Sequence, residues 1–212
     1  MTSASPSPPR VSVITPTWQR ADLLLGRCVP AVQAQTYPNV EHVIVSDGPD
    51  PELAARIPAV GPTVVPIRFE ELPAHGGHWG IDARLRGIEL AAGDLITYCD
   101  DDDAYRPRHA EVLAAALEDP TAAFAYAQMQ TWNGTQPVEI LGQDPPTPGT
   151  VGTCTMHRRT TLAAGTWQRD LPNIDYTLVA RWMAGGMRHK FVPEITCDCW
   201  CSCWNHPRFR DG

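Results

Sequence analysis

The chain has 212 residues, of which 43% are hydrophobic and 19% charged, with 17 Lys and Arg against 24 Asp and Glu. This length and apolar content fit one α/β domain with a sizeable core, and they exclude disorder over the bulk of the chain. No apolar run approaches the roughly 20 residues of a membrane-spanning helix, and no basic stripe typical of a nucleic-acid binder is present. The net charge of −7 is local, since Asp100–Asp103 alone contribute four negative charges.

The first ten residues, MTSASPSPPR, contain no apolar segment. We therefore expect residues 1–10 to form a disordered lead-in rather than a signal peptide. The chain has seven cysteines and no export signal, a combination that favours a reducing compartment. These features predict a cytoplasmic protein without a membrane span.

Residues 11–130 are predicted to alternate strands and helices, which is typical of a doubly wound, mostly parallel sheet flanked by helices. Short continuous apolar runs indicate buried strands. Pro30 should kink or shorten the first helix, and Pro107 suits the first position of a later one. The expected strands are 11–14, 40–45, 64–69, 95–99 and 122–129, and the expected helices are 21–35, 50–57, 81–92 and 107–117.

The alternation breaks down after residue 130. Residues 133–150 are rich in Pro, Gly and Thr, so we expect a loop there with one strand at 138–141. A helix is predicted at 174–184, and strands are predicted at 189–192 and 195–203.

Polar residues follow three of the expected parallel strands. They are the segment Pro16-Thr17-Trp18, Asp47, and the run Asp100–Asp103. Ligands of open α/β sheets bind outside the carboxyl ends of the strands, so these residues should share one edge. Four adjacent carboxylates raise one another's pKa unless a cation compensates them, and oxygen ligands favour Mg²⁺ or Mn²⁺. The alternative is a solvated acidic turn preceding a helix.

Three segments of this sequence, VSVITPTWQR, VIVSDGPD and ARLRGIELAAGDLITYCDDDD, stand in this order along the chain. They resemble the motifs of the inverting family 2 glycosyltransferases of the GT-A fold, which typically contain VSVIIPTYNR, VVDDGSTD and ARNxGIxxAxGxYIxFLDxDD. The resemblance is close over residues 11–105 and looser beyond them. It implies a GT-A domain at residues 11–212, with a nucleotide-sugar half at about 11–130 and an acceptor half at 131–212.

The resemblance implies that Pro16, Thr17 and Trp18 hold the nucleobase, with the Trp18 ring stacked on it. Asp47 matches the aspartate that accepts a hydrogen bond from uracil N3–H. Without the resemblance, Trp18 could be an ordinary tryptophan after a strand, and Asp47 could begin an Asx turn before Gly48.

The diphosphate side of the site is assigned in the same way. The resemblance places Asp100 and Asp101 against the ribose and diphosphate, with Arg84 near the diphosphate. Asp102 matches the aspartate that binds the Mn²⁺ or Mg²⁺ ion, which neutralises charge on the leaving diphosphate. The alternative for Arg84 is a solvated position on a helix face.

The sequence also departs from the family pattern. Leu85 replaces the usual Asn of the ARN motif, and Ser46 replaces the first Asp of DDG. The arginine that some relatives carry upstream of this helix is replaced by His75 and His78, of which His78 is the candidate for a phosphate contact. These departures bear on which nucleotide is bound.

The acceptor half must supply one general base for a single displacement. Asp175 stands at the start of a predicted helix, where the helix dipole favours its ionised form. The resemblance implies that Asp175 is the base, whereas Asp170 is a nearby competitor. N-terminal capping of the helix is the structural alternative for Asp175.

The C-terminal run TCDCWCSCW holds cysteines at alternate positions from Cys197 to Cys203. On a strand they would all lie on one face, and we expect a buried face of thiols. Zinc or a disulfide is the alternative. The resemblance implies that His206 completes the metal shell, with an exposed histidine as the alternative.

The sequence therefore predicts a metal-dependent inverting glycosyltransferase that uses a nucleotide-diphospho-sugar, with a UDP-sugar favoured. The expected acceptor is a soluble small molecule or glycan. The alternatives are a nucleotidyltransferase and a non-catalytic sugar-nucleotide-binding module.

Overall fold

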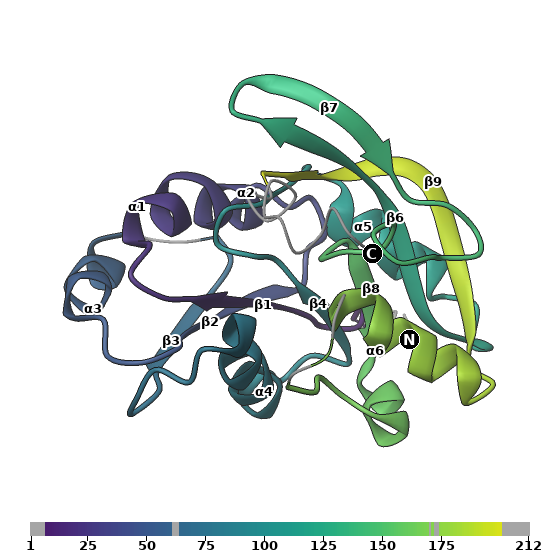
Figure 1. Cartoon of the computed structure of the whole chain (residues 1–212), viewed down its shortest axis with the longest axis horizontal. Coiled ribbons are helices and arrows are strands. Elements are labelled where there is room, and N and C mark those ends of the chain that lie inside the picture. The colour runs from purple at the N-terminus through teal and green to yellow at the C-terminus, as the bar shows by residue number, and fades with distance from the viewer. Residues whose placement is uncertain (1–6, 61–63, 170, 172–173, 201–212) are drawn as a thin grey trace, which may run out of the picture.

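The computed structural model describes residues 7–60, 64–169, 171 and 174–200 (Figure 1). Within them, no helix is long and apolar enough to cross a membrane. The predicted lead-in falls mostly outside the described residues. Its described part, residues 7–10, is exposed and has no regular secondary structure.

Four parallel strands form the half of the sheet that precedes the aspartate run. They lie in the order β3-β2-β1-β4, so β1 is central. All seven residues of β1 are buried because helices cover both of its faces. The strands are β1 Val11–Thr17, β2 Val40–Ser46, β3 Ile67–Glu71 and β4 Leu95–Tyr98.

The helices pack in two layers, α1 and α2 on one side of these strands and α4 on the other (Figure 1). Successive side chains of β1 point to opposite faces of the sheet, so they pack in two separate hydrophobic clusters. Val13 packs in a cluster with Leu24, whereas Ile14 packs in a second cluster with Ile81. The helices are α1 Ala21–Leu23, α2 Val29–Gln33, α3 Pro51–Arg56, α4 Ile81–Leu90, α5 His109–Ala116 and α6 Ile174–Ala184. Shorter helical segments are a π-helical turn, Leu24–Cys28, and the 3₁₀ segments Ile57–Val60, His78–Gly80 and Arg159–Ala164.

The remaining strands extend the same sheet in the order β4-β8-β6-β9-β5, and β7 pairs with β6. This part is mixed, because β8 is antiparallel to both β4 and β6 whereas β9 is parallel to β6. The strands are β5 Ala104–Tyr105, β6 Ala122–Asn133, β7 Gln136–Leu141, β8 Thr155–Arg158 and β9 Arg188–Cys199. The predicted α/β class, with a sheet flanked by helices, is confirmed.

Several predicted boundaries are wrong, for identifiable reasons. The predicted helix 21–35 is interrupted by the π-helical turn just before Pro30, and its last segment α2 ends at Gln33, as expected for a proline that kinks or shortens a helix. The strand expected from residue 64 begins at Ile67, and Val64 is exposed. The helix expected from Pro107 begins at His109. The two predicted C-terminal strands form one continuous β9, with irregular register against β6.

Candidate functional site

The aspartate run follows β4 and alternates between buried and partly exposed side chains. Asp101 and Asp103 are 3% and 2% exposed, whereas the carboxylates of Asp100 and Asp102 retain access to solvent. The inward-facing pair binds neighbouring elements. Asp101 Oδ2 accepts a hydrogen bond from Thr17 Oγ1 at 2.8 Å, which ties the end of β1 to the run. The alternation therefore separates structural carboxylates from accessible ones.

Both carboxylate oxygens of the buried Asp103 accept hydrogen bonds from other segments of the chain. Its Oδ1 accepts the backbone N–H of Trp200 at 3.0 Å, and its Oδ2 accepts the Thr153 hydroxyl at 3.1 Å. Burial, reinforced by the charges of Asp100 and Asp102, raises the pKa of Asp103 well above its usual range. Asp103 thus joins the run to the end of β9 and to the segment before β8.

Arginine side chains partly neutralise the negative charge of the aspartate run. Arg20 pairs with Asp101 Oδ1 at 2.8 Å and with Asp102 Oδ2 at 2.5 Å. Arg27 donates to the backbone carbonyl of Asp102 at 2.6 Å. Burial nevertheless raises the pKa of Asp101 to about 7, and Arg20 only partly opposes this. Arg20 could not be predicted as part of the site, although it stands in the TPTWQR motif, because an ion pair between residues 81 positions apart has no local sequence signal.

Arg84 lies on α4 and is only 4% exposed, so the alternative of a solvated helix face is wrong. Its guanidinium forms an ion pair with Asp100 and donates to the backbone carbonyl of Trp79. It also lies 5.1 Å from the centroid of the Trp167 ring. Among the described residues its Nε–H has no hydrogen-bond partner. Arg84 is therefore placed where a further acceptor could still be bound.

Asp47 lies at the end of β2 and is 2% exposed. Its Oδ1 and Oδ2 accept the backbone N–H groups of Gly76 and Gly77 at 3.2 and 3.1 Å, and His75 Nδ1 lies 2.8 Å from its carbonyl oxygen. The carboxylate thus organises the loop before α4. Each carboxylate oxygen has about two acceptor sites, so capacity for another donor remains.

The ring of Trp18 stacks on His75, with centroids 4.4 Å apart and planes inclined by 10°. The stack covers Gly48, whose φ of +129° and lack of a side chain allow this approach. Pro16 and Thr17 are buried in β1 just before Trp18. His78 is exposed within a turn of positive φ, outside this stack. The predicted base-binding residues Thr17, Trp18 and Asp47 therefore gather at one edge of the sheet.

Asp175 lies in the first turn of α6, as predicted. Its Oδ1 is buried, and it has no hydrogen-bond partner among the described residues. Burial raises the pKa of Asp175 to about 6; the charge of Arg84 opposes this rise and that of Asp100 adds to it. Burial therefore opposes the ionised form that the start of a helix favours, and a pKa of about 6 still leaves the carboxyl mostly ionised at pH 7. The competitor Asp170 lies outside the described residues.

The family is decided by a sequence comparison. The model of glycosyl transferase family 2 matches residues 12–171. This chain belongs to glycosyl transferase family 2. It is 31% identical over 121 residues to the uncharacterized glycosyltransferase YwdF of Bacillus subtilis, covering 57% of this chain and 42% of YwdF. It is also 31% identical over 122 residues to the putative colanic acid biosynthesis glycosyl transferase WcaA of Escherichia coli, covering 56% of this chain and 42% of WcaA. The chain thus spans less than half of these relatives' length.

Two solved structures are similar to this chain in fold at low sequence identity. S. aureus TarS 1–349 in complex with UDP-GlcNAc is similar with a TM-score of 0.75 and 14% identity, over 96% of this chain and 61% of that one. The mannosyltransferase PcManGT of Pyrobaculum calidifontis, in complex with GDP-Man and Mn²⁺, gives a TM-score of 0.73 and 18% identity, over 97% of this chain and 62% of that one. These likenesses confirm the GT-A fold.

A divalent cation in this family 2 chain would have few protein ligands. Among the described residues, no three His, Cys, Asp or Glu side chains converge as a metal cage. Mg²⁺, however, is commonly held by one or two carboxylates together with substrate phosphates. The partly exposed carboxylate of Asp102 has the hard oxygen donors that suit such an ion. His206, the other predicted ligand, lies outside the described residues.

Buried thiols surround the aspartate run. Cys28, Cys99, Cys154 and Cys197 are each 0% exposed and are free thiols, whereas Cys199 is half-buried. The predicted buried face of thiols on β9 is confirmed for Cys197. Cys201 and Cys203 lie outside the described residues. The described cysteines thus fill space in the core.

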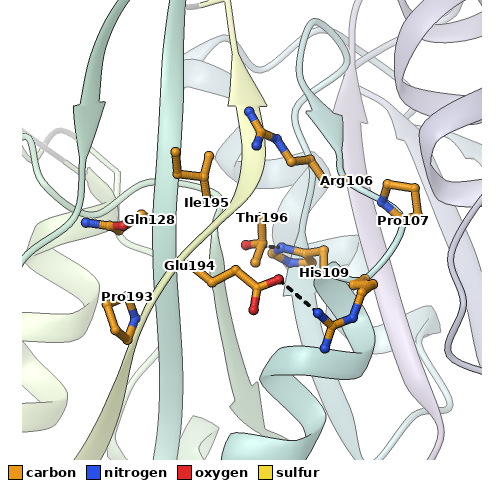
Figure 2. A pocket seen from close by; sticks show the side chains of 9 residues that line it. Arg106, Pro107, His109, Gln128, Pro193, Glu194, Ile195 and Thr196 are labelled. Carbon is orange, nitrogen blue, oxygen red and sulfur yellow. Dashed lines mark hydrogen bonds and ion pairs between the residues drawn. The ribbon is translucent and has the colours of Figure 1, made fainter.

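A cavity of about 670 Å³ opens between the start of α5 and β9 (Figure 2), and none of the predicted site residues lines it. Its charged groups are paired: Arg106 with Asp198 at 2.9 Å and Arg108 with Glu194 at 3.4 Å. The buried His109 bonds to the hydroxyl of Thr196 at 2.9 Å. The cavity is lined by Arg106, Pro107, Arg108, His109, Gln128, Pro193, Glu194, Ile195 and Thr196.

Proposed function

We propose that this chain is a metal-dependent inverting glycosyltransferase that moves a sugar from a nucleotide-diphospho-sugar, with a UDP-sugar favoured, to a small-molecule or glycan acceptor. One observation carries the proposal. Asp175 and Trp167 line the same small cavity, and Arg84, which pairs with Asp100, lies 5.1 Å from the Trp167 ring, so this carboxylate is close to the aspartate run. A transferase needs a base and a leaving-group site side by side.

The donor would lie along the edge formed by the ends of β1, β2 and β4. Trp18 offers an aromatic surface for the base, and Asp47 offers acceptor capacity for an imide N–H. Arg84 and Arg20 would offset the charge of the diphosphate beside Asp100 and Asp101. The neighbours TarS and PcManGT, solved with UDP-GlcNAc and with GDP-Man, support a donor of this chemical class.

Asp102 would hold the divalent cation together with the donor's phosphates. When bound, such an ion supplies Lewis-acid stabilisation of the departing diphosphate. The complex of PcManGT with Mn²⁺ supports this choice of cation. Displacement of Arg20 from the Asp102 carboxylate would make that carboxylate available.

Asp175 would act as the general base. The acceptor hydroxyl attacks the anomeric carbon from the face opposite the diphosphate, and its proton passes to the Asp175 carboxylate. The bond from the anomeric carbon to the diphosphate oxygen breaks, its electron pair leaves with the diphosphate, and the configuration inverts. A pKa of about 6 leaves Asp175 mostly ionised above pH 7 and a stronger base than an ordinary aspartate.

Calorimetry with UDP and GDP, each with Mn²⁺ and with EDTA, tests donor binding. We expect nucleotide binding with Mn²⁺, much weaker binding in EDTA, and the same weakening in Asp102→Asn. The exposed Asp94 provides a matched control, and Asp94→Asn should bind as the wild type does. Equal affinity with and without metal would refute the role of Asp102.

Base preference is tested separately with Asp47→Ala. Loss of a buried acceptor should remove about 1–3 kcal/mol of discrimination between uridine and cytidine diphosphates. An unchanged preference would leave Asp47 only the loop role seen in its bonds to Gly76 and Gly77.

Release of free sugar or a glycoside from the donor distinguishes a glycosyltransferase from a non-catalytic sugar-nucleotide-binding module. Release of pyrophosphate from a nucleoside triphosphate would indicate a nucleotidyltransferase.

A further inference from the structure

A second, much smaller cavity lies against Asp175, between α6, β8 and the end of β4. Its volume of about 10 Å³ is close to the space that one water-sized group requires. It is lined by Tyr98, Gly152, Thr153, Thr155, Trp167, Asp175, Leu178, Val179 and Trp182. A cavity of this size can admit a single hydroxyl group.

Most polar side chains around this cavity already have partners. The Tyr98 hydroxyl lies 3.0 Å from His157 Nε2, and Trp182 Nε1–H donates to the carbonyl of Gly165 at 2.9 Å. Thr153 and Thr155 donate to Asp103 and to the carbonyl of Gly152, at 3.1 and 3.2 Å. Because these groups already form hydrogen bonds within the protein, they do not require a ligand.

Two lining atoms are exceptions within the described part of the chain. Trp167 Nε1–H and Asp175 Oδ1 are both buried without a hydrogen-bond partner. Trp167 as a whole is only 5% exposed. The indole ring is perpendicular to the Tyr98 ring, with the centroids 4.9 Å apart. Its N–H is close enough to the Tyr98 hydroxyl to oppose the rise in the pKa of that group, but the two groups do not align as a hydrogen bond. Unpaired buried polar atoms are rare in native proteins, so two in one cavity require an explanation.

The two atoms are chemically complementary. One is a donor and the other an acceptor, and a hydroxyl group accepts and donates one hydrogen bond at the same time. We propose that Trp167 Nε1–H and Asp175 Oδ1 together bind one hydroxyl group of a substrate, which makes Trp167 a residue that positions substrate and determines specificity. This inference rests on the proposed function, since Asp175 is its general base. The hydroxyl belongs either to the attacking acceptor or to the donor sugar.

Trp167→Phe tests the proposal, because phenylalanine keeps an aromatic edge against Tyr98 and removes the N–H. Trp182→Phe is the matched control: it removes an indole N–H from the same cavity, but one already bonded to Gly165. With UDP-GlcNAc or GDP-mannose as the probe, whichever the wild type cleaves, we expect Trp167→Phe to lower the turnover efficiency by about 5- to 100-fold. Its resistance to denaturant should be unchanged or higher, whereas Trp182→Phe should be less stable.

Binding measurements distinguish the two sources of the hydroxyl. If it belongs to the donor sugar, Trp167→Phe weakens binding of the nucleotide sugar and leaves binding of the bare nucleoside diphosphate unchanged. If it belongs to the acceptor, both affinities persist and only turnover falls. Unchanged turnover and unchanged affinities, with reduced stability, would overturn the proposal and make Trp167 a structural residue.

Failure of the proposed function would give a different pattern. The wild type would then neither bind nor cleave either nucleotide sugar. The hydroxyl site can still be examined by following the indole ¹H–¹⁵N resonance of Trp167 in the intact protein during titration with glycerol, with Trp182 as the internal reference. A shift confined to Trp167 supports the site, and an unmoved resonance overturns it.

Discussion

Replacement of Asp175 by Asn should stabilise the fold while it removes the proposed general base. Burial raises the pKa of Asp175 from 3.8 to about 6, so the folded state holds the proton more tightly than the unfolded state does. Below pH 3.8 both states are protonated and the group has no effect. As the pH rises through 6, the unfolded state ionises first and the wild type loses stability.

The magnitude follows from the difference in pKa. About 2 pKa units at about 1.4 kcal/mol each give about 3 kcal/mol, which the wild type loses fully above pH 6. Asp175→Asn is spared this loss, and no hydrogen bond to Oδ1 among the described residues is sacrificed. We therefore expect the variant to exceed the wild type by up to about 3 kcal/mol at pH 8 and to equal it near pH 3.5.

Urea denaturation of both proteins at pH 3.5, 6 and 8 measures this difference, with Asp94→Asn as the exposed control. Sugar transfer on the same preparations should fall by about 10²–10⁴-fold in Asp175→Asn, with donor affinity retained. An Asn variant that is no more stable than the wild type at pH 8 would show that burial does not govern this carboxylate. A fully active variant would remove Asp175 from the mechanism.

Three further outcomes are expected. Gly48→Ala should destabilise the fold by about 1–3 kcal/mol and weaken nucleotide binding, because the new Cβ would lie 2.6 Å from the Trp18 ring; thermal melting and calorimetry would show both effects. Arg20→Met should raise the Mn²⁺ affinity of the nucleotide-free protein, since it releases the Asp102 carboxylate; unchanged metal affinity would contradict this. Asp103→Ala should cost about 2–4 kcal/mol by leaving two buried donors unpaired, and a variant as stable as the wild type would show that these bonds are dispensable.

The parallel half of the sheet could be predicted from the sequence because its strands are short apolar runs that end in turn residues. The short strands β5 and β8 could not. β8 contains the buried His157 beside Met156, so it shows neither alternation nor a continuous apolar run. β5 has only two residues and is defined by pairing with β9, more than 90 positions away.

The candidate site shows the same division. Trp18, Asp47, the aspartate run and Asp175 stand in local motifs, and their roles stay predictions. The pairing of Arg20 with the run depends on the three-dimensional arrangement, as does the unsatisfied indole of Trp167. Such properties arise only when segments distant in the sequence meet, so no local pattern reports them.

The alternation along Asp100–Asp103 makes four identical letters inequivalent. Asp101 and Asp103 are buried and bonded to neighbouring segments, whereas the carboxylates of Asp100 and Asp102 are partly exposed. An insertion or deletion of one aspartate in this run would hardly alter composition or charge. Counted from Cys99, the deletion would nevertheless place Ala104 where the Asp103 carboxylate now accepts its two hydrogen bonds. The position of each carboxylate along this turn, rather than the number of acidic residues, is therefore what sequence changes here must preserve.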